Sequence, residues 1–284
     1  MHTTLIDAAT LSQHLQDPNW VILDCRHDLM NPNAGRDGFA IGHIAGAQFA
    51  NVDTDLSGAK LGADGAFRGR HPLPERAALI ATLRSWGINH DTQVVAYDAH
   101  GGMFAARLWW LLRWVGHPAV AVLDGGLAAW QSAGLAMVTS NDQRTPGQIG
   151  DRPSLVATVS VEEVVANLST RARTVVDARA ADRYRGENET IDPVGGHIPG
   201  AKNRFFKDNL TAEGRFKDAA QLKADFAPLF DSAPQAIMQC GSGVTACHNL
   251  LALEIAGLPG AALYPGSWSE WCADSARPVA TGTD

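Results

Sequence analysis

An internal repeat constrains the fold of this 284-residue chain more than any other feature. Four segments of the first half recur in the same order in the second half, at offsets of 153, 154, 142 and 141 positions. The matching pairs are Val21–Arg26 with Thr174–Arg179, Gly42–Ala47 with Gly196–Ala201, Val94–Asp98 with Ala236–Cys240, and Gly125–Trp130 with Gly266–Trp271. The order and the single drop in offset indicate a duplicated domain that lost part of a loop in its second copy.

Each half alternates short apolar runs with amphipathic stretches, the pattern of an α/β domain with a parallel sheet. The predicted strands are Val21–Leu23, Val94–Tyr97, Ala119–Leu123, Val175–Val176, Ile237–Gln239 and Ala261–Tyr264. Helices are expected over Glu75–Trp86, Ala219–Phe230 and Ala246–Ala256. We predict an N-terminal domain over 1–137, a linker over 138–156, rich in Ser, Thr, Gly and Pro, and a C-terminal domain over 157–284.

Composition limits the classes of partner. The formal net charge is −7 and basic residues do not cluster, which argues against binding to nucleic acid. No segment has the apolar length of a membrane span, and no signal peptide is expected at the start. The four cysteines lack the spacing of a disulfide framework, so we predict a cytoplasmic protein with reduced thiols. No cofactor and no metal site is expected.

One cysteine stands where a nucleophile would be expected. Cys240 ends a predicted strand and precedes the turn Gly241, Ser242, Gly243, Val244, Thr245 and Ala246, after which a helix is predicted. Backbone N–H groups of such a turn, together with the helix N-terminus, favour a thiolate and can hold an anionic persulfide. The alternative, a buried structural cysteine, suits Cys25, Cys247 and Cys272 better.

The loop from Cys240 to Ala246 resembles the active-site loop of the 3-mercaptopyruvate sulfurtransferases, a group within the rhodanese superfamily. The two Gly-His-Ile-x-Gly-Ala segments, the run Arg70–Pro74 and the run Gly266–Trp271 are similar to segments of that family as well. The resemblance covers about Ile22 to Trp271. It implies tandem rhodanese-like domains, each a parallel five-stranded sheet flanked by helices. Asp98 takes the cysteine's place in the first domain, which is therefore expected to be structural and catalytically inactive.

The resemblance also implies the chemistry. The Cys240 thiolate would take the sulfur of 3-mercaptopyruvate as a persulfide, release pyruvate, and pass the sulfur to a thiol such as thioredoxin or glutathione, or to cyanide. Thiosulfate-preferring relatives place Arg and Lys directly after the cysteine, where this chain has Gly241 and Ser242. The loop therefore offers a dianion no side-chain cation, which favours mercaptopyruvate.

Further substrate-binding residues follow from position. Arg183 matches the family's substrate-binding arginine and suits a carboxylate, with Arg185 as a second candidate or an ion-pair partner. Many relatives carry another arginine in the loop that corresponds to 187–195, which has none here, so Arg70 is a possible substitute. His43 corresponds to a family histidine proposed to relay protons with Ser242. Its alternative role is to stabilise its own turn, as His197 would in the repeat.

Three other functions compete with this prediction. A thiosulfate:cyanide sulfurtransferase differs only in its donor contacts. A non-catalytic sulfur-relay or binding module would retain the fold without turnover. A cysteine-dependent phosphatase would need an arginine six residues after the cysteine, where this chain has Ala246.

Overall fold

The computed structural model of the chain describes residues 1–140 and 144–283, and it divides into two compact units. Unit 1 consists of Met1–Gly58, Pro74–Leu155 and Ala212–Phe216. Unit 2 consists of Ala59–Leu73, Val156–Thr211 and Lys217–Asp284, of which Asp284 is not described. The segment Ala59–Leu73 thus belongs to unit 2, although the sequence repeat groups it with the first half of the chain.

Unit 1 contains a five-stranded sheet in the order β1-β6-β5-β2-β4, and every neighbouring pair is parallel. Its strands are β1 (Leu5–Ile6), β6 (Val120–Leu123), β5 (Gln93–Tyr97), β2 (Trp20–Asp24) and β4 (Ala47–Phe49). A separate antiparallel pair joins β3 (His43–Ile44) to β7 (Met137–Val138). The three central strands consist mainly of buried Val, Ile, Leu and Ala, as expected for a sheet covered on both faces.

Unit 2 repeats this sheet in the equivalent order β8-β12-β11-β9-β10, again with parallel neighbours only. Its strands are β8 (Ala157–Thr158), β12 (Ala262–Leu263), β11 (Ala236–Gln239), β9 (Thr174–Asp177) and β10 (Lys202–Asn203). The predicted pair of five-stranded parallel α/β domains is confirmed. Strand β11 occupies the central position that β5 occupies in unit 1.

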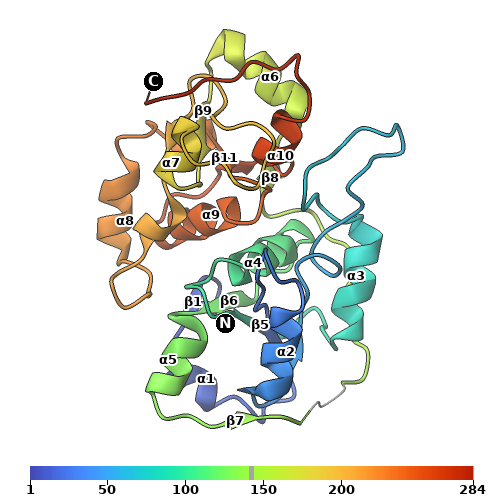
Figure 1. Cartoon of the computed structure of the whole chain (residues 1–284). Coiled ribbons are helices and arrows are strands. Elements are labelled where there is room, and N and C mark those ends of the chain that lie inside the picture. The colour runs from blue at the N-terminus through green and yellow to red at the C-terminus, as the bar shows by residue number, and fades with distance from the viewer. Residues whose placement is uncertain (141–143, 284) are drawn as a thin grey trace. The chain divides into compact units, whose positions relative to one another are not determined.

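Helices flank both sheets (Figure 1). In unit 1 they are α1 (Ala8–Ser12), α2 (Ala34–Ile41), α3 (Arg76–Ser85), α4 (Ala105–Trp114) and α5 (Gly126–Ser132). In unit 2 they are α6 (Val161–Thr170), α7 (Ala181–Arg185), α8 (Ala219–Phe226), α9 (Ala246–Ile255) and α10 (Ser267–Trp271), with 3₁₀ turns at Phe206–Asn209 and Ala233–Gln235. Helix α8 is shorter than expected because Pro228 has no N–H with which to continue it.

Each unit has its own apolar core. In unit 1, Trp109 and Trp110 of α4 are fully buried, and Trp130 packs in the cluster that includes Val95 and Ala121. In unit 2, Trp268 and Trp271 of α10 lie in the cluster that covers the sheet. These tryptophans contribute to the cores of the two units.

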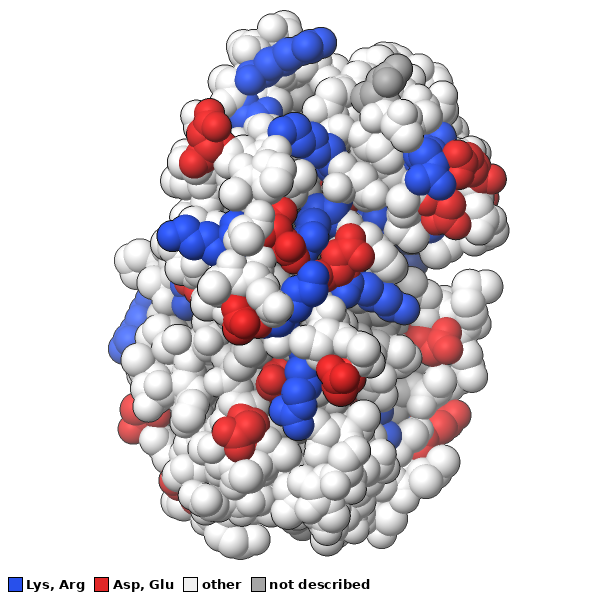
Figure 2. Space-filling model, turned by 90° about the vertical axis from the view of Figure 1, so that its left-hand side faces the viewer, with Lys and Arg blue, Asp and Glu red and all other residues white. Residues whose placement is uncertain are grey.

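The predicted linker 138–156 is ordered along unit 1 where it is described; its residues 141–143 lie outside the described part. Backbone N–H groups of Gly147 and Ile149 donate to carbonyls of Arg84 and Ile88, at 2.7 and 3.0 Å. Among the described residues, no helix is long and apolar enough to cross a membrane. On the face seen in Figure 2, acidic and basic side chains are interspersed.

Candidate active site

Cys240 lies at the carboxyl end of β11, the edge at which parallel α/β sheets bind their ligands. The residue is 1% exposed. Its backbone is fixed by the turn that begins α10: the Cys240 N–H donates to Ser267 Oγ (3.1 Å), and the Trp268 N–H donates to the Cys240 carbonyl (2.9 Å). The Ser269 N–H donates in turn to the Gly241 carbonyl at 3.0 Å. The start of α10 therefore holds Cys240 and the residue that follows it in position.

The loop from Gly241 to Thr245 turns around the sulfur before α9 begins at Ala246. The Gly243 N–H donates to Cys240 Sγ at 3.1 Å. Gly243 has φ +76°, and a Cβ there would lie 2.3 Å from the Pro265 carbonyl oxygen. Only glycine fits this point without strain or clash. A hydrogen bond from a backbone amide stabilises a sulfur anion more than a neutral thiol.

Unit 1 shows what the same turn can hold. Asp98 follows β5 as Cys240 follows β11, and its buried carboxylate accepts backbone N–H groups of four residues at 2.7 to 2.9 Å. The donors are His100, Gly102, Phe104 and Ala105. In unit 1 the turn is therefore an anion cradle that is filled by the protein's own carboxylate. In the equivalent turn of unit 2, the Gly243 N–H donates to the Cys240 sulfur.

Ser242 of the loop is hydrogen-bonded to a histidine that the sequence did not single out. Its Oγ lies 2.8 Å from Nδ1 of His71, which belongs to the segment Ala59–Leu73 of unit 2. Both residues are buried. The only sequence signal for His71 was the family-like run Arg70–Pro74, in which Arg70 alone had been considered.

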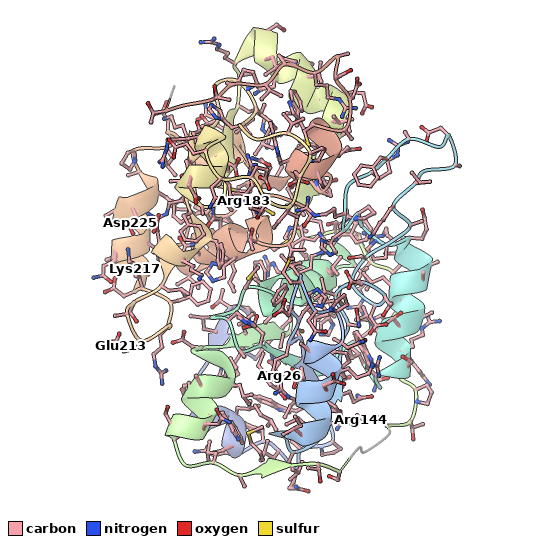
Figure 3. The ribbon with its side chains drawn as sticks, viewed as in Figure 1. Arg26, Arg144, Arg183, Glu213, Lys217 and Asp225 are labelled. Atoms are coloured by element: carbon pink, nitrogen blue, oxygen red, sulfur yellow. The ribbon has the colours of Figure 1, made fainter. Side chains whose placement is uncertain are left out.

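Two arginines lie beside the first residue of the loop. A Cβ built on Gly241 would lie 2.8 Å from Arg70 Nη2 and 3.7 Å from Arg183 Nη1. Figure 3 labels Arg183, which comes from α7 of unit 2. Burial lowers the pKa of Arg70, and the nearby Cys240 sulfur opposes that shift. The fold thus brings Arg183 and Arg70 to the cysteine loop, although both lie far from it along the chain.

Two buried carboxylates of the loop 187–195 hold these arginines. Glu189 accepts from Arg183 Nε at 3.0 Å and from its Nη2 at 2.7 Å. Asp192 accepts from Arg70 Nη1 through Oδ1 and from Arg183 Nη2 through Oδ2, the latter at 3.2 Å. Neither acid was predicted from the sequence, where this loop differs from the family by lacking an arginine.

The structure places the other two candidates differently. Arg185 forms an ion pair with Glu187 at 2.7 Å, with 31% of the Arg185 side chain and 56% of the Glu187 side chain exposed. His43 is buried in unit 1, stacked on Phe39, and its two ring nitrogens meet the carbonyls of Phe39 and Ser140 at 2.8 Å each. These contacts favour the alternative in which His43 stabilises its own turn. His197 is stacked on Tyr184 in the same way.

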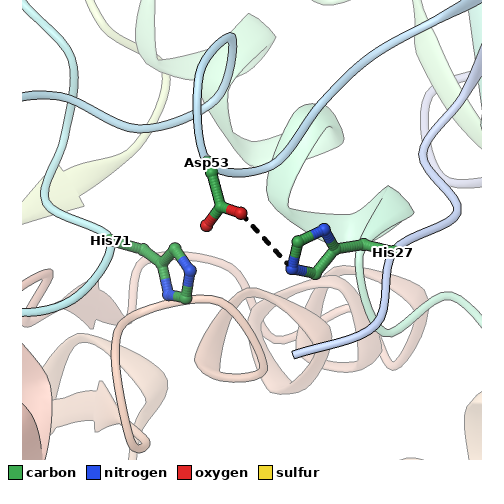
Figure 4. A group of neighbouring side chains, drawn as sticks. All are labelled: His27, Asp53 and His71. Atoms are coloured by element: carbon green, nitrogen blue, oxygen red, sulfur yellow. Dashed lines mark ion pairs between the residues drawn. The ribbon is translucent and has the colours of Figure 1, made fainter. Parts of the chain in front are cut away.

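Two other thiols and one other histidine lie outside the cysteine loop. Cys25 and Cys272 are buried, and burial raises the pKa of both thiols, which keeps them protonated near neutral pH. In unit 1, His27 Nε2 lies 3.8 Å from the Asp53 carboxylate (Figure 4). Burial lowers the pKa of His27, so that this contact joins a neutral imidazole to a carboxylate at neutral pH.

Comparison with known proteins gives one consistent result. The family described as rhodanese-like domain matches residues 7–133 and 160–274. The chain is 46% identical over 281 residues to the probable 3-mercaptopyruvate sulfurtransferase of Pseudomonas aeruginosa, covering 98% of each. It is 40% identical over 285 residues to a putative thiosulfate sulfurtransferase of Mycobacterium tuberculosis, covering 98% of this chain and 97% of the relative.

Solved structures agree with these relatives. The crystal structure of the Escherichia coli 3-mercaptopyruvate sulfurtransferase is similar with a TM-score of 0.80 and 32% identity, covering 94% of this chain and all of that one. The 3-mercaptopyruvate sulfurtransferase of Leishmania major is similar with a TM-score of 0.85 and 28% identity. That match covers 98% of this chain and 76% of the Leishmania chain.

Proposed function

This chain belongs to the rhodanese-like family, and we propose that it transfers sulfur from 3-mercaptopyruvate to a thiol or to cyanide. In this proposal the sulfur is carried as a persulfide on Cys240. That the chain is a sulfurtransferase follows from its relatives. The donor, the covalent intermediate and the acceptor are the proposed part. The observation that carries the proposal is the buried Cys240 sulfur that accepts a backbone N–H inside a turn whose counterpart in unit 1 holds a carboxylate.

The first half-reaction forms one S–S bond and breaks one C–S bond. The Cys240 thiolate attacks the sulfur of 3-mercaptopyruvate, and the electron pair of the C–S bond leaves with the carbon as the enolate of pyruvate. That enolate takes up a proton and departs as pyruvate. Ser242, in the loop that follows Cys240, forms a hydrogen-bonded pair with His71, and we assign this pair the delivery of that proton.

The second half-reaction restores the thiolate. An acceptor thiolate, such as that of thioredoxin or glutathione, attacks the outer sulfur of the persulfide, and the S–S electron pair returns to Cys240. Cyanide attacks the same sulfur and leaves as thiocyanate. The Gly243 N–H donates to the Cys240 sulfur, and we assign it the role of holding the negative charge of the sulfur before and after each transfer.

The donor's carboxylate needs a cationic partner near the loop. Within the described residues, Arg70 Nη2 and Arg183 Nη1 have no hydrogen-bond partner, and they are the two guanidinium atoms nearest to Gly241. Together they offer two N–H donors to one carboxylate, an arrangement that fixes its orientation as well as its charge. Arg70 thereby fills the role of the arginine that the loop 187–195 lacks.

Thiosulfate is the second candidate donor. Two arginines at the loop would attract a dianion, and one relative at 40% identity is named a putative thiosulfate sulfurtransferase. The loop itself argues for mercaptopyruvate, since its first two positions are Gly241 and Ser242. A non-catalytic sulfur relay would retain the cradle but not require the paired arginines.

Side-by-side kinetics test the proposal. We expect kcat/KM with cyanide as acceptor to be higher for 3-mercaptopyruvate than for thiosulfate, and both activities to vanish in Cys240→Ala. A preference for thiosulfate would keep the nucleophile and overturn the donor. Turnover of either donor by Cys240→Ala would overturn the persulfide mechanism, and no turnover by the wild type would point to a relay.

A further inference from the structure

We propose that Asp192 is a specificity-determining residue, whose negative charge makes the donor site select monoanionic donors such as 3-mercaptopyruvate over dianionic donors such as thiosulfate. The inference rests on the proposed function, because it concerns the donor of that same reaction. It adds a discriminating element outside the cysteine loop.

The position of Asp192 supports this role. Its carboxylate lies between the two arginines, with Oδ1 toward Arg70 and Oδ2 toward Arg183, and only 3% of the side chain is exposed. Each arginine gives one Nη nitrogen to Asp192 and holds its other Nη nitrogen beside Gly241. A donor anion bound at the nitrogens beside Gly241 would therefore contact two guanidinium groups that already donate to Asp192.

The backbone that carries Asp192 is fixed as well. Glu189 Oε1 accepts the N–H groups of Ile191 and Asp192, at 2.9 and 3.0 Å. Pro193, the next residue, restricts the backbone of Asp192 to extended conformations. Because Asp192 is held in this way, its carboxylate cannot easily move aside when an anion arrives, and its charge acts on every donor that binds.

In the cluster of arginines and carboxylates near Gly241, counted without the Cys240 thiolate, the charges balance to zero. Three arginines, Arg70, Arg179 and Arg183, contact three buried acids, Asp177, Glu189 and Asp192. Arg179 is paired with Asp177 at 2.6 Å, and Arg183 is paired through two nitrogens with Glu189. Asp192 therefore offsets the charge that Arg70 would otherwise contribute. Without it, the cluster would carry one net positive charge.

Repulsion by a fixed charge scales with the charge of the donor. The carboxylate of 3-mercaptopyruvate meets the negative field of Asp192 with one charge, whereas thiosulfate meets it with two. Short-range charges in a partly buried site are weakly screened, so the difference is not lost in solvent. We expect removal of the Asp192 charge to shift the ratio of kcat/KM values by about tenfold toward thiosulfate, which corresponds to about 1.4 kcal/mol.

The test is Asp192→Asn in the full chain, with kcat/KM measured for 3-mercaptopyruvate and for thiosulfate on the same preparation. A ratio taken within one preparation is insensitive to the fraction of folded protein. The matched control is Glu187→Gln, which removes one negative charge from the same loop, but from a side chain that is 56% exposed. We expect the ratio to shift in Asp192→Asn and to stay within about twofold of wild type in Glu187→Gln, since exposed charges are well screened.

Wild-type protein provides a second test that does not depend on how the variant folds. Pyruvate and sulfate, one a monoanion and the other a dianion of nearly the same shape as thiosulfate, are compared as competitive inhibitors. We expect pyruvate to bind more tightly. An unchanged donor ratio in Asp192→Asn, loss of both activities in a variant that melts like wild type, or tighter inhibition by sulfate would each overturn the inference. Failure of wild-type turnover with both donors would instead refute the proposed function, and the inference with it.

Discussion

Ser267 combines a strained backbone with two buried hydrogen bonds, and two substitutions can separate these effects. The residue has φ +54°, in the left-handed region, whereas the equivalent position of unit 1 is Gly126 with φ +56°. Its hydroxyl accepts the Cys240 N–H at 3.1 Å and donates to the Tyr264 carbonyl at 2.9 Å. All three residues of this bridge in unit 2 are at most 1% exposed.

Both Ser267→Ala and Ser267→Gly remove the hydroxyl. The buried Cys240 N–H then loses its hydrogen-bond acceptor, and the buried Tyr264 carbonyl loses its hydrogen-bond donor. Each such loss costs about 1–3 kcal/mol, so we expect the two losses together to lower the free energy of unfolding by about 2–6 kcal/mol. Glycine, however, adopts positive φ without the Cβ penalty of about 1–2 kcal/mol that alanine pays. The expected order of stability is wild type, then Ser267→Gly, then Ser267→Ala.

Chemical denaturation of the three proteins measures this order, and thermal melting follows it at about 2–4 °C per kcal/mol for a domain of this size. We also expect both variants to lose kcat, because the Cys240 backbone loses an anchor. The matched control is Gly126→Ala in unit 1, where an added Cβ would lie 2.4 Å from the Asp98 carbonyl oxygen and should destabilise without touching Cys240. If Ser267→Ala were more stable than Ser267→Gly, the argument from backbone strain would be refuted.

Three more predictions follow from the contacts. Asp98→Ala should lower the free energy of unfolding by more than about 3 kcal/mol, because four buried N–H groups lose their acceptor, and equal stability in denaturant would contradict the cradle. Arg183→Lys should raise KM for 3-mercaptopyruvate at least about tenfold in steady-state kinetics, because a lysine cannot replace the planar fork; an unchanged KM would remove Arg183 from the donor site. Burial raises the pKa of Glu270, so the folded state binds its proton more tightly and the free energy of unfolding should fall as pH rises from the ordinary glutamate pKa through the raised one. Melting curves of Glu270→Gln should lack that part of the pH dependence, and identical curves for both proteins would contradict it.

The sequence identified the residues whose role depends on local chain order. The repeat placed Cys240 and Asp98 at equivalent strand ends, and the glycine-containing turn indicated an anion cradle before any contact was known. These features can be predicted from the sequence because the strand, the tight turn and the helix follow one another along the chain. Apolar periodicity indicates where the strand and the helix begin and end.

The sequence did not identify the partners that the fold brings from a distance. His71 lies 171 positions from Ser242 and belongs to a segment that the repeat assigned to the other half. Asp192 was one acid in a loop whose pairing with Arg70 depends on tertiary structure. Arg185 follows Arg183 by two positions on a short helix, and such residues point to different faces, so only one of the two could reach the loop.

The proposed persulfide on Cys240 is tested most directly by mass spectrometry. The intact protein is incubated with 3-mercaptopyruvate without an acceptor, its thiols are blocked, and its peptides are mapped. We predict a gain of one sulfur atom on the Cys240 peptide that disappears when cyanide is added and never forms in Cys240→Ala. A gain on Cys25, Cys247 or Cys272 instead, or turnover with no sulfur retained on the protein, would contradict the account.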